Sequence, residues 1–245
     1  MRLIRIAGTA LCLLLLLALA HAQSLNIDLG AAGQAGATGR LIQLTALVTL
    51  LSVAPSLLVM VTAFTRIVIV LSLLRSALSA QGTPPNMVLI GLALFLTFSV
   101  MQPVLEQSWT LGLLPLTEGR VGEIDGLRLA IEPFHHFMTA NLRPADLQLF
   151  LDIAHLPPPP TPDDIPWRAL VPAFLVGELR RAFEMGFLLF LPFLIIDMVV
   201  ASVLMSMGMM MLSPVLVSLP FKLMLFGLAD GWNLLIGSLV ASYST

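Results

Sequence analysis

The sequence predicts an all-α integral membrane protein built from four apolar, kinked helical blocks that form hairpins, with a small helical periplasmic domain. Two observations support this fold class. The 245 residues are 58% hydrophobic and 11% charged, whereas soluble domains carry about 25% charged residues. Uncharged stretches such as 41–65 and 76–105 are long enough for bilayer spans, which need about 20 apolar residues.

Residues 1–22 have the pattern of a signal peptide. Arg2 and Arg5 precede a short apolar run, and an Ala-His-Ala sequence predicts cleavage after Ala22. An uncleaved membrane anchor is the alternative. The only cysteine, Cys12, lies before this site, so cleavage would leave no residue for disulfides or thiol chemistry. Residues 23–40 are rich in Gly and Ala and predict a flexible periplasmic lead-in.

Residues 41–104 predict the first transmembrane hairpin. Its first span covers 41–65, with a kink at Pro55, and its second covers about 87–104. The positive-inside rule then places the intervening Arg66 and Arg75 in the cytoplasm. The segment that follows the second span is therefore expected outside.

Residues 105–168 are more polar and mostly acidic, and they end in a proline-rich linker at 157–166. Apolar residues at helical spacing predict a short amphipathic helix at 141–151. We interpret this region as the periplasmic domain. Its histidines, among them the pair His135 and His136, are expected to lie on the surface rather than to bind a metal.

Residues 169–245 predict a second helical hairpin. One helix covers 169–205 and bends at Pro192, and another covers 214–239 and breaks near Asp230. A methionine-rich loop joins the two helices.

Lys222, the only lysine, lies between apolar residues. An unpaired lysine at the centre of a membrane helix costs about 2.5–3.5 kcal/mol, so it requires a carboxylate. The candidates are Glu178, Asp197 and Asp230. We expect Glu178, within the chain or across a subunit boundary, and hypothesise that Lys222 is needed for assembly. Alternatively, Glu178 pairs locally with Arg181, as Arg180 does with Glu184.

Five methionines occur between residues 205 and 211. Three of them are consecutive, namely Met209, Met210 and Met211. Consecutive side chains would point in different directions around a helix, so they cannot form one packing stripe. The alternative is that the methionines fill the core. Gly208 allows the backbone to turn. The pattern predicts a loop that presents flexible thioethers to a shared central axis.

The sequence lacks phosphate-binding, metal-binding and nucleophile motifs. We therefore expect no enzyme activity and no cofactor. A net charge of −2 argues against nucleic-acid binding.

Three segments, 65–75, 84–103 and 205–232, together resemble the FliP family, the export-gate proteins of flagellar type III secretion. The resemblance implies a multi-pass protein of the bacterial inner membrane, in the flagellar basal body. Several copies would surround a pore together with FliQ-like and FliR-like subunits and other export-apparatus proteins, and unfolded proteins would pass through it.

The resemblance also assigns roles to residues. Met209, Met210 and Met211 match a gasket that closes the idle pore, and Met205, Met207 and Gly208 would support it. Phe137 and Phe150 are the residues expected to contact neighbouring copies in the periplasm. The alternatives are an injectisome export-gate subunit, or a small-solute transporter or channel that uses Asp197, Lys222 and Asp230 as a relay.

Overall fold

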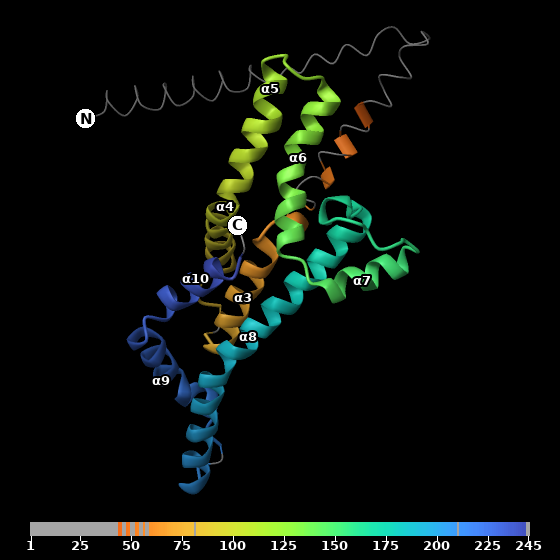
Figure 1. The fold of residues 1–245 in the computed structure, drawn as a ribbon. Coiled ribbons are helices and arrows are strands. Elements are labelled where there is room, and N and C mark those ends of the chain that lie inside the picture. The colour runs from red at the N-terminus through yellow and green to blue at the C-terminus, as the bar shows by residue number, and fades with distance from the viewer. Residues whose placement is uncertain are drawn as a thin grey trace, which may run out of the picture. The chain divides into compact units, whose positions relative to one another are not determined.

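A computed structural model describes residues 44–45, 48–49, 52–53, 56, 59–80, 82–209 and 211–243. The structure is 81% helical, and none of the described residues forms a strand (Figure 1). The predicted signal peptide with Ala22, the lead-in 23–40 and Pro55 lie outside this description.

The helices follow one another with short connections. In chain order they are α3 (Phe64–Ala77), α4 (Asn86–Gln107), the π-helix η1 (Ser108–Leu113), α5 (Leu114–Thr117), α6 (Glu123–Ala140), α7 (Pro144–Ile153), the 3₁₀-helix η2 (Pro162–Asp164), α8 (Trp167–Ser206), α9 (Pro214–Leu228) and α10 (Gly231–Ala241).

Two continuous helical stretches are long and apolar enough to cross a membrane, namely Asn86–Thr117 and Trp167–Ser206. The pair α9 and α10, bent by 63°, would add a third span if it counts as one. The predicted break near Asp230 is thus confirmed. The block 41–65 is only partly described, so a fourth span remains a prediction.

One predicted boundary falls inside a helix. The helical stretch from Asn86 continues to Thr117, so position 105 is helical, and the start of the periplasmic segment stays a prediction. The predicted helix over 169–205 corresponds to α8, which continues through Pro192. The predicted amphipathic helix at 141–151 corresponds to α7.

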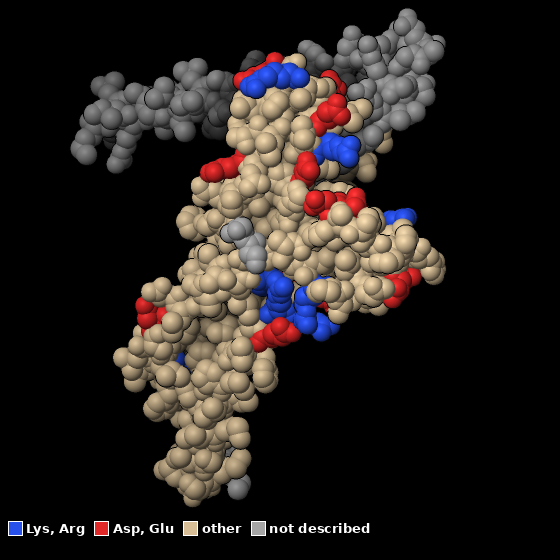
Figure 2. All heavy atoms as spheres, in the orientation of Figure 1, with Lys and Arg blue, Asp and Glu red and all other residues tan. Residues whose placement is uncertain are grey.

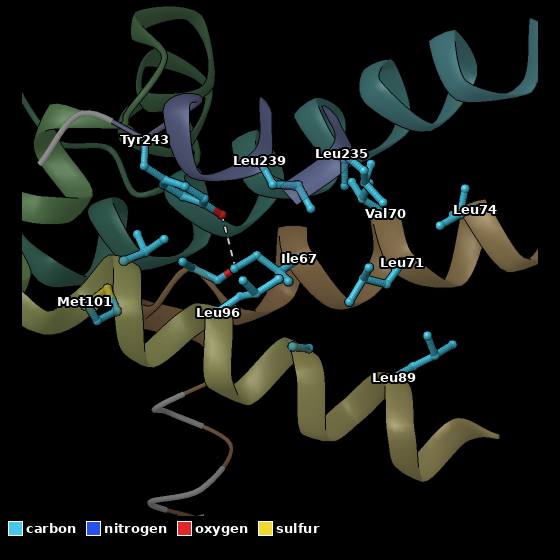
Figure 3. Packing of buried hydrophobic residues seen from close by; sticks show 14 of the residues in the cluster. Ile67, Val70, Leu71, Leu74, Leu89, Leu96, Met101, Leu235, Leu239 and Tyr243 are labelled. Carbon is cyan, nitrogen blue, oxygen red and sulfur yellow. Dashed lines mark hydrogen bonds between the residues drawn. The ribbon is translucent and has the colours of Figure 1, made fainter. Parts of the chain in front are cut away.

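The core is centred on α3. Its residues Ile67, Val70, Leu71 and Leu74 are at most 1% exposed. Figure 3 shows α3 between α4, which contributes Leu89, Leu96 and Met101, and α10, which contributes Leu235 and Leu239. Arg66 also lies in this core, and it is 0% exposed. Its expected position on the cytoplasmic side of the membrane stays a prediction.

α8 has two unlike halves. With 40 residues it is about 60 Å long, about twice the thickness of a bilayer's hydrocarbon core. Its N-terminal half packs against α3 and α7 and carries four charged residues between 178 and 184. From residue 185 onward its only charged residue is Asp197. This half ends in the nearly all-tan part of Figure 2, so it presents an apolar surface.

Candidate functional site

Lys222 is buried on α9, with 1% of its side chain exposed. Its Nζ donates hydrogen bonds to Asp197 Oδ2 at 2.6 Å, to Ser79 Oγ at 2.9 Å and to the Ala77 carbonyl at 3.2 Å. These acceptors match the three N–H donors of an ammonium group. Ala77 is the last residue of α3, where the helix dipole favours a cation.

Asp197 joins this cluster from α8. Its Oδ1 accepts a hydrogen bond from Ser218 at 2.5 Å, and its side chain is 28% exposed. The Lys222 cluster therefore connects α8 and α9 with the C-terminal end of α3. Of the three candidate acids, Asp197 is the one that meets Lys222 within the chain.

The other two candidates lie elsewhere. Asp230 is exposed in the bend between α9 and α10, where it has a φ of +50° and accepts a hydrogen bond from Asn233 at 3.1 Å. Glu178 pairs with Arg66 rather than with Lys222. The expected pairing of Glu178 with Lys222 inside the chain is therefore corrected.

Arg66 and Glu178 form a second cluster in which both side chains are 0% exposed. Arg66 Nε donates to Glu178 Oε2 at 3.0 Å, and Arg66 Nη2 donates to Oε1. This two-pronged geometry is the one that suits a guanidinium and a carboxylate best. The pair joins α3 to α8 deep in the core.

Two residues after α10 complete the Arg66 cluster. Arg66 Nη1 donates to the Ser242 carbonyl at 3.1 Å and to Ser242 Oγ at 2.8 Å. The Tyr243 ring lies under the guanidinium, 3.8 Å from its central carbon. Burial, together with the neighbouring Glu178 carboxylate, raises the pKa of the Tyr243 hydroxyl, so this hydroxyl keeps its proton and donates.

The local pairs on α8 that the sequence offered as the alternative do not form. Arg180 instead lies 3.6 Å from Asp146 Oδ1, and Glu184 lies 3.3 Å from Arg143 Nη1. Both pairs cross from α8 to the N-terminal end of α7. Sequence spacing missed these contacts because pairs within a helix and pairs between helices have the same residue types.

Asp146 was not singled out from the sequence. It is 4% exposed, and its Oδ2 is the buried side-chain atom that lacks a hydrogen-bond partner in the described part of the chain. This oxygen faces α8 at Gly177, where an added Cβ would lie 3.5 Å from it. The seam between α7 and α8 thus contains an acceptor without a donor.

The methionine-rich turn follows α8. Gly208 has a φ of +76°, Gly208 N–H donates to the Met205 carbonyl at 3.0 Å, and Met209 N–H donates to the Leu204 carbonyl at 2.9 Å. This is the Schellman arrangement, in which glycine ends a helix at low conformational cost. Pro214 then begins α9, a position where its missing N–H costs nothing.

The side chains of this turn are largely uncovered. Met205, Met207, Met209 and Met211 are 65%, 66%, 41% and 102% exposed. Met210 lies outside the described residues. The alternative that these methionines fill the core of their own chain is therefore wrong for the four whose positions are described.

The two phenylalanines expected to contact neighbouring copies differ in exposure. Phe137 is 4% exposed and packs between Phe174 and Tyr243, with ring centroids 5.9 and 6.0 Å away. The ring of Phe137 is enclosed by its own chain, so the prediction that it contacts neighbouring copies is wrong. Phe150 on α7 is half-buried, so it stays a prediction.

Within the ranges that the structure covers, no group of three or more His, Cys, Asp or Glu side chains is arranged to hold a metal ion. His135 contacts the Ile165 carbonyl at 2.8 Å, and His136 lies 3.4 Å from Asp163. These histidines connect α6 to the segment before α8.

Comparison with known proteins shows one family. The model of the FliP family matches residues 47–239. "Flagellar biosynthetic protein FliP" of Caulobacter vibrioides is 52% identical over 92% of this chain and 85% of its own length. The proteins of that name from Agrobacterium fabrum and Bacillus subtilis are 47% and 52% identical, over 98% and 82% of this chain and 100% and 91% of their own lengths. The chain therefore belongs to the FliP family.

Proposed function

We propose that this chain is a pore-forming subunit of the flagellar type III protein export gate in the bacterial inner membrane. Family membership and relatives named for flagellar biosynthesis support a role in the flagellar export apparatus. The long apolar helices support a membrane location. Unfolded flagellar proteins are the substrates.

The single observation that carries the pore is the exposed methionine turn. Met207, Met209 and Met211 follow the apolar half of α8, and their exposed fractions are 66%, 41% and 102%. Figure 1 shows that the C-terminal end of α8 extends away from the other helices. Thioether side chains are unbranched and adapt to many shapes. Gathered from several copies around an axis, they would close an empty pore and yield to substrates of any sequence.

The apolar half of α8 supports assembly from several subunits. Only 11% of the most apolar 18-residue window in α8 is buried. Apolar surface on this scale needs lipid or protein against it. In the proposed gate, neighbouring copies and FliQ-like and FliR-like subunits cover part of it. Phe150 contributes to contacts between copies.

The proposed topology has a signal peptide cleaved after Ala22, hairpins at 41–104 and 169–245, and periplasmic residues 105–168. Acidic and proline-rich composition supports placing 105–168 outside the bilayer. α6 and α7 form its helical part.

A triple change of Met209, Met210 and Met211 to Ala tests the gasket. We expect the complex to assemble and the idle pore to leak ions, because alanine is too short to fill the constriction. The measurement is ion flux across the membrane of proteoliposomes that contain the complex. Secretion of flagellar proteins is measured in cells in parallel.

A matched control changes three exposed methionines outside the turn, Met87, Met198 and Met224, to Ala. It should leave the ion flux unchanged. The gasket is refuted if the two triple variants leak equally, or if both stay as tight as the parent complex.

The two alternatives fit less well. A solute relay through Asp197, Lys222 and Asp230 would need these groups in a chain, whereas Asp230 is exposed in the bend and Lys222 is occupied by three acceptors. An injectisome role is disfavoured because the matched relatives carry flagellar names. Deleting the gene should abolish motility, and a plasmid-borne copy should restore it. This result would distinguish the flagellar role from the injectisome role.

A further inference from the structure

The segment after α10 returns to the centre of the protein, although nothing in its sequence marks it as functional. We propose that Ser242 and Tyr243 form a latch that positions the buried Arg66–Glu178 pair and holds α10 along α3. This latch is a positioning device, separate from the proposed gasket. Figure 3 shows Tyr243 above the start of α3, with its hydroxyl directed at that helix.

The hydrogen bonds of Arg66 show why the pair needs the latch. Nε and Nη2 of the guanidinium are directed at Glu178, whereas Nη1 reaches only Ser242. The whole side chain is 0% exposed, so no solvent is at hand to replace a lost acceptor. A buried charged group that lacks a partner is costly. Ser242 therefore completes a site that α3 and α8 leave open.

Tyr243 closes the same site from one face. Its ring stacks on Phe137 and under the Arg66 guanidinium, and only 7% of the residue is exposed. Its hydroxyl lies 2.8 Å from Glu178 Oε2 and 3.1 Å from the Ala63 carbonyl, and it shares its hydrogen between these acceptors. One side chain thus contacts the arginine, its carboxylate and the turn before α3.

The latch has a counterpart at the other end of α3. Lys222 on α9 binds the Ala77 carbonyl and Ser79, whereas the latch, which follows α10, binds the first turn of α3 near Arg66 and Ala63. α3 has 14 residues, so these polar anchors lie about 20 Å apart along it. The bent pair of α9 and α10 therefore contacts both ends of α3, through Lys222 in the middle of α9 and through the residues after α10.

Apolar packing alone holds α10 weakly. Of its residues only Leu235 and Leu239 are buried, and both face α3 (Figure 3). Segments with few buried apolar residues open locally before the rest of a protein unfolds. Without the latch, α10 should detach from α3 while α9 stays fixed through Lys222.

The test uses the purified full-length protein in detergent with the variants Tyr243→Phe and Ser242→Ala. The matched control is Ser238→Ala, because Ser238 lies on α10 and its hydroxyl bonds only the Leu235 carbonyl nearby. We expect Tyr243→Phe to speed hydrogen exchange in α10 about tenfold, since it removes a buried hydrogen bond to a carboxylate. Exchange in α7 should not change.

A double-mutant cycle separates the latch from simple packing. If the Tyr243 hydroxyl acts through Glu178, then Tyr243→Phe should have a clearly smaller effect in a Glu178→Gln background. Ser242→Ala should give a milder increase in α10 exchange, because the Ser242 carbonyl remains as an acceptor. The proposal is overturned if Tyr243→Phe behaves like Ser238→Ala, or if its effect simply adds to that of Glu178→Gln.

Discussion

Two ion pairs with buried cations, both in the described part of the chain, differ in how completely they leave water. Arg66 and Glu178 are both 0% exposed, whereas Lys222 is 1% exposed and its partner Asp197 is 28% exposed. The first pair is enclosed by Tyr243 and Ser242, and the second stays open at its carboxylate. The difference indicates that the Arg66 pair depends on its neighbours for every donor and acceptor, while the Lys222 pair keeps access to its surroundings.

The geometry of each pair suits its side-chain chemistry. A guanidinium presents donors in a planar fork that fits a carboxylate with two bonds, whereas an ammonium is a compact point charge. Arg66 makes two bonds to Glu178, and Lys222 combines one carboxylate with a hydroxyl and a helix-end carbonyl. Exchanging the two acids between the cations would break both geometries.

The largest effect is expected from Arg66→Met. This change leaves Glu178 as a buried carboxylate with little compensation, and breaking such a pair costs about 3–5 kcal/mol. Thermal or denaturant unfolding of the purified protein measures it. Arg75→Met on the same helix is the control, because Arg75 is partly exposed and bonds Asn86 across a turn.

The double variant Arg66→Met with Glu178→Met sharpens this test. Replacing both charges with apolar groups often restores stability, so the double variant should be more stable than Arg66→Met alone. A double variant that is less stable than the single one would show that the pair matters through something other than its buried charge.

A smaller and asymmetric effect is expected at the second pair. Asp197→Asn leaves an ammonium in a fully buried site and should cost about 3 kcal/mol. Lys222→Met leaves a carboxylate that is partly exposed and still bonded to Ser218, and should cost about 1–2 kcal/mol. Equal losses for both variants in an unfolding measurement would contradict the difference in exposure.

Charge reversal identifies the partner of Lys222 during assembly. Lys222→Asp should reduce assembly of the complex, and adding Asp197→Lys should recover part of it. A Lys222→Glu variant combined with Glu178→Lys should gain nothing, because Glu178 serves Arg66. Recovery through Glu178 instead would place the functional pair across a subunit boundary.

The smallest effect is expected at the seam between α7 and α8. Gly177→Ser places a hydroxyl beside the unpaired Asp146 Oδ2, and Gly177→Ala adds only the Cβ. Serine is the poorer helix former, yet its new hydrogen bond should make it more stable than alanine by roughly 0.5–1 kcal/mol. This difference should vanish in an Asp146→Ala background. If Gly177→Ala is instead the more stable variant, the serine hydroxyl adds no hydrogen bond, because Asp146 Oδ2 has another donor.

Local sequence determined much of the helical architecture. Gly208 and Pro214 end and begin helices through their own backbone properties, and the break near Asp230 occurs where Asp230 adopts a left-handed conformation, which Asp tolerates better than most residues. Lys222 can be identified from the sequence as a candidate site residue, because no other charge lies near it in the sequence. These features depend on neighbours within a few residues, so the sequence contains them.

Tertiary structure alone decided the partners. Arg66 meets Glu178 across 112 positions and Ser242 across 176, and a charge within an apolar run does not indicate which distant group it meets. The burial of α3, of Phe137 and of Asp146 was likewise set by packing among helices. In the apolar half of α8, apolar side chains on every face leave no amphipathic stripe to show which face is covered, so only the packed protein distinguishes the core from the surface that faces lipid or partners.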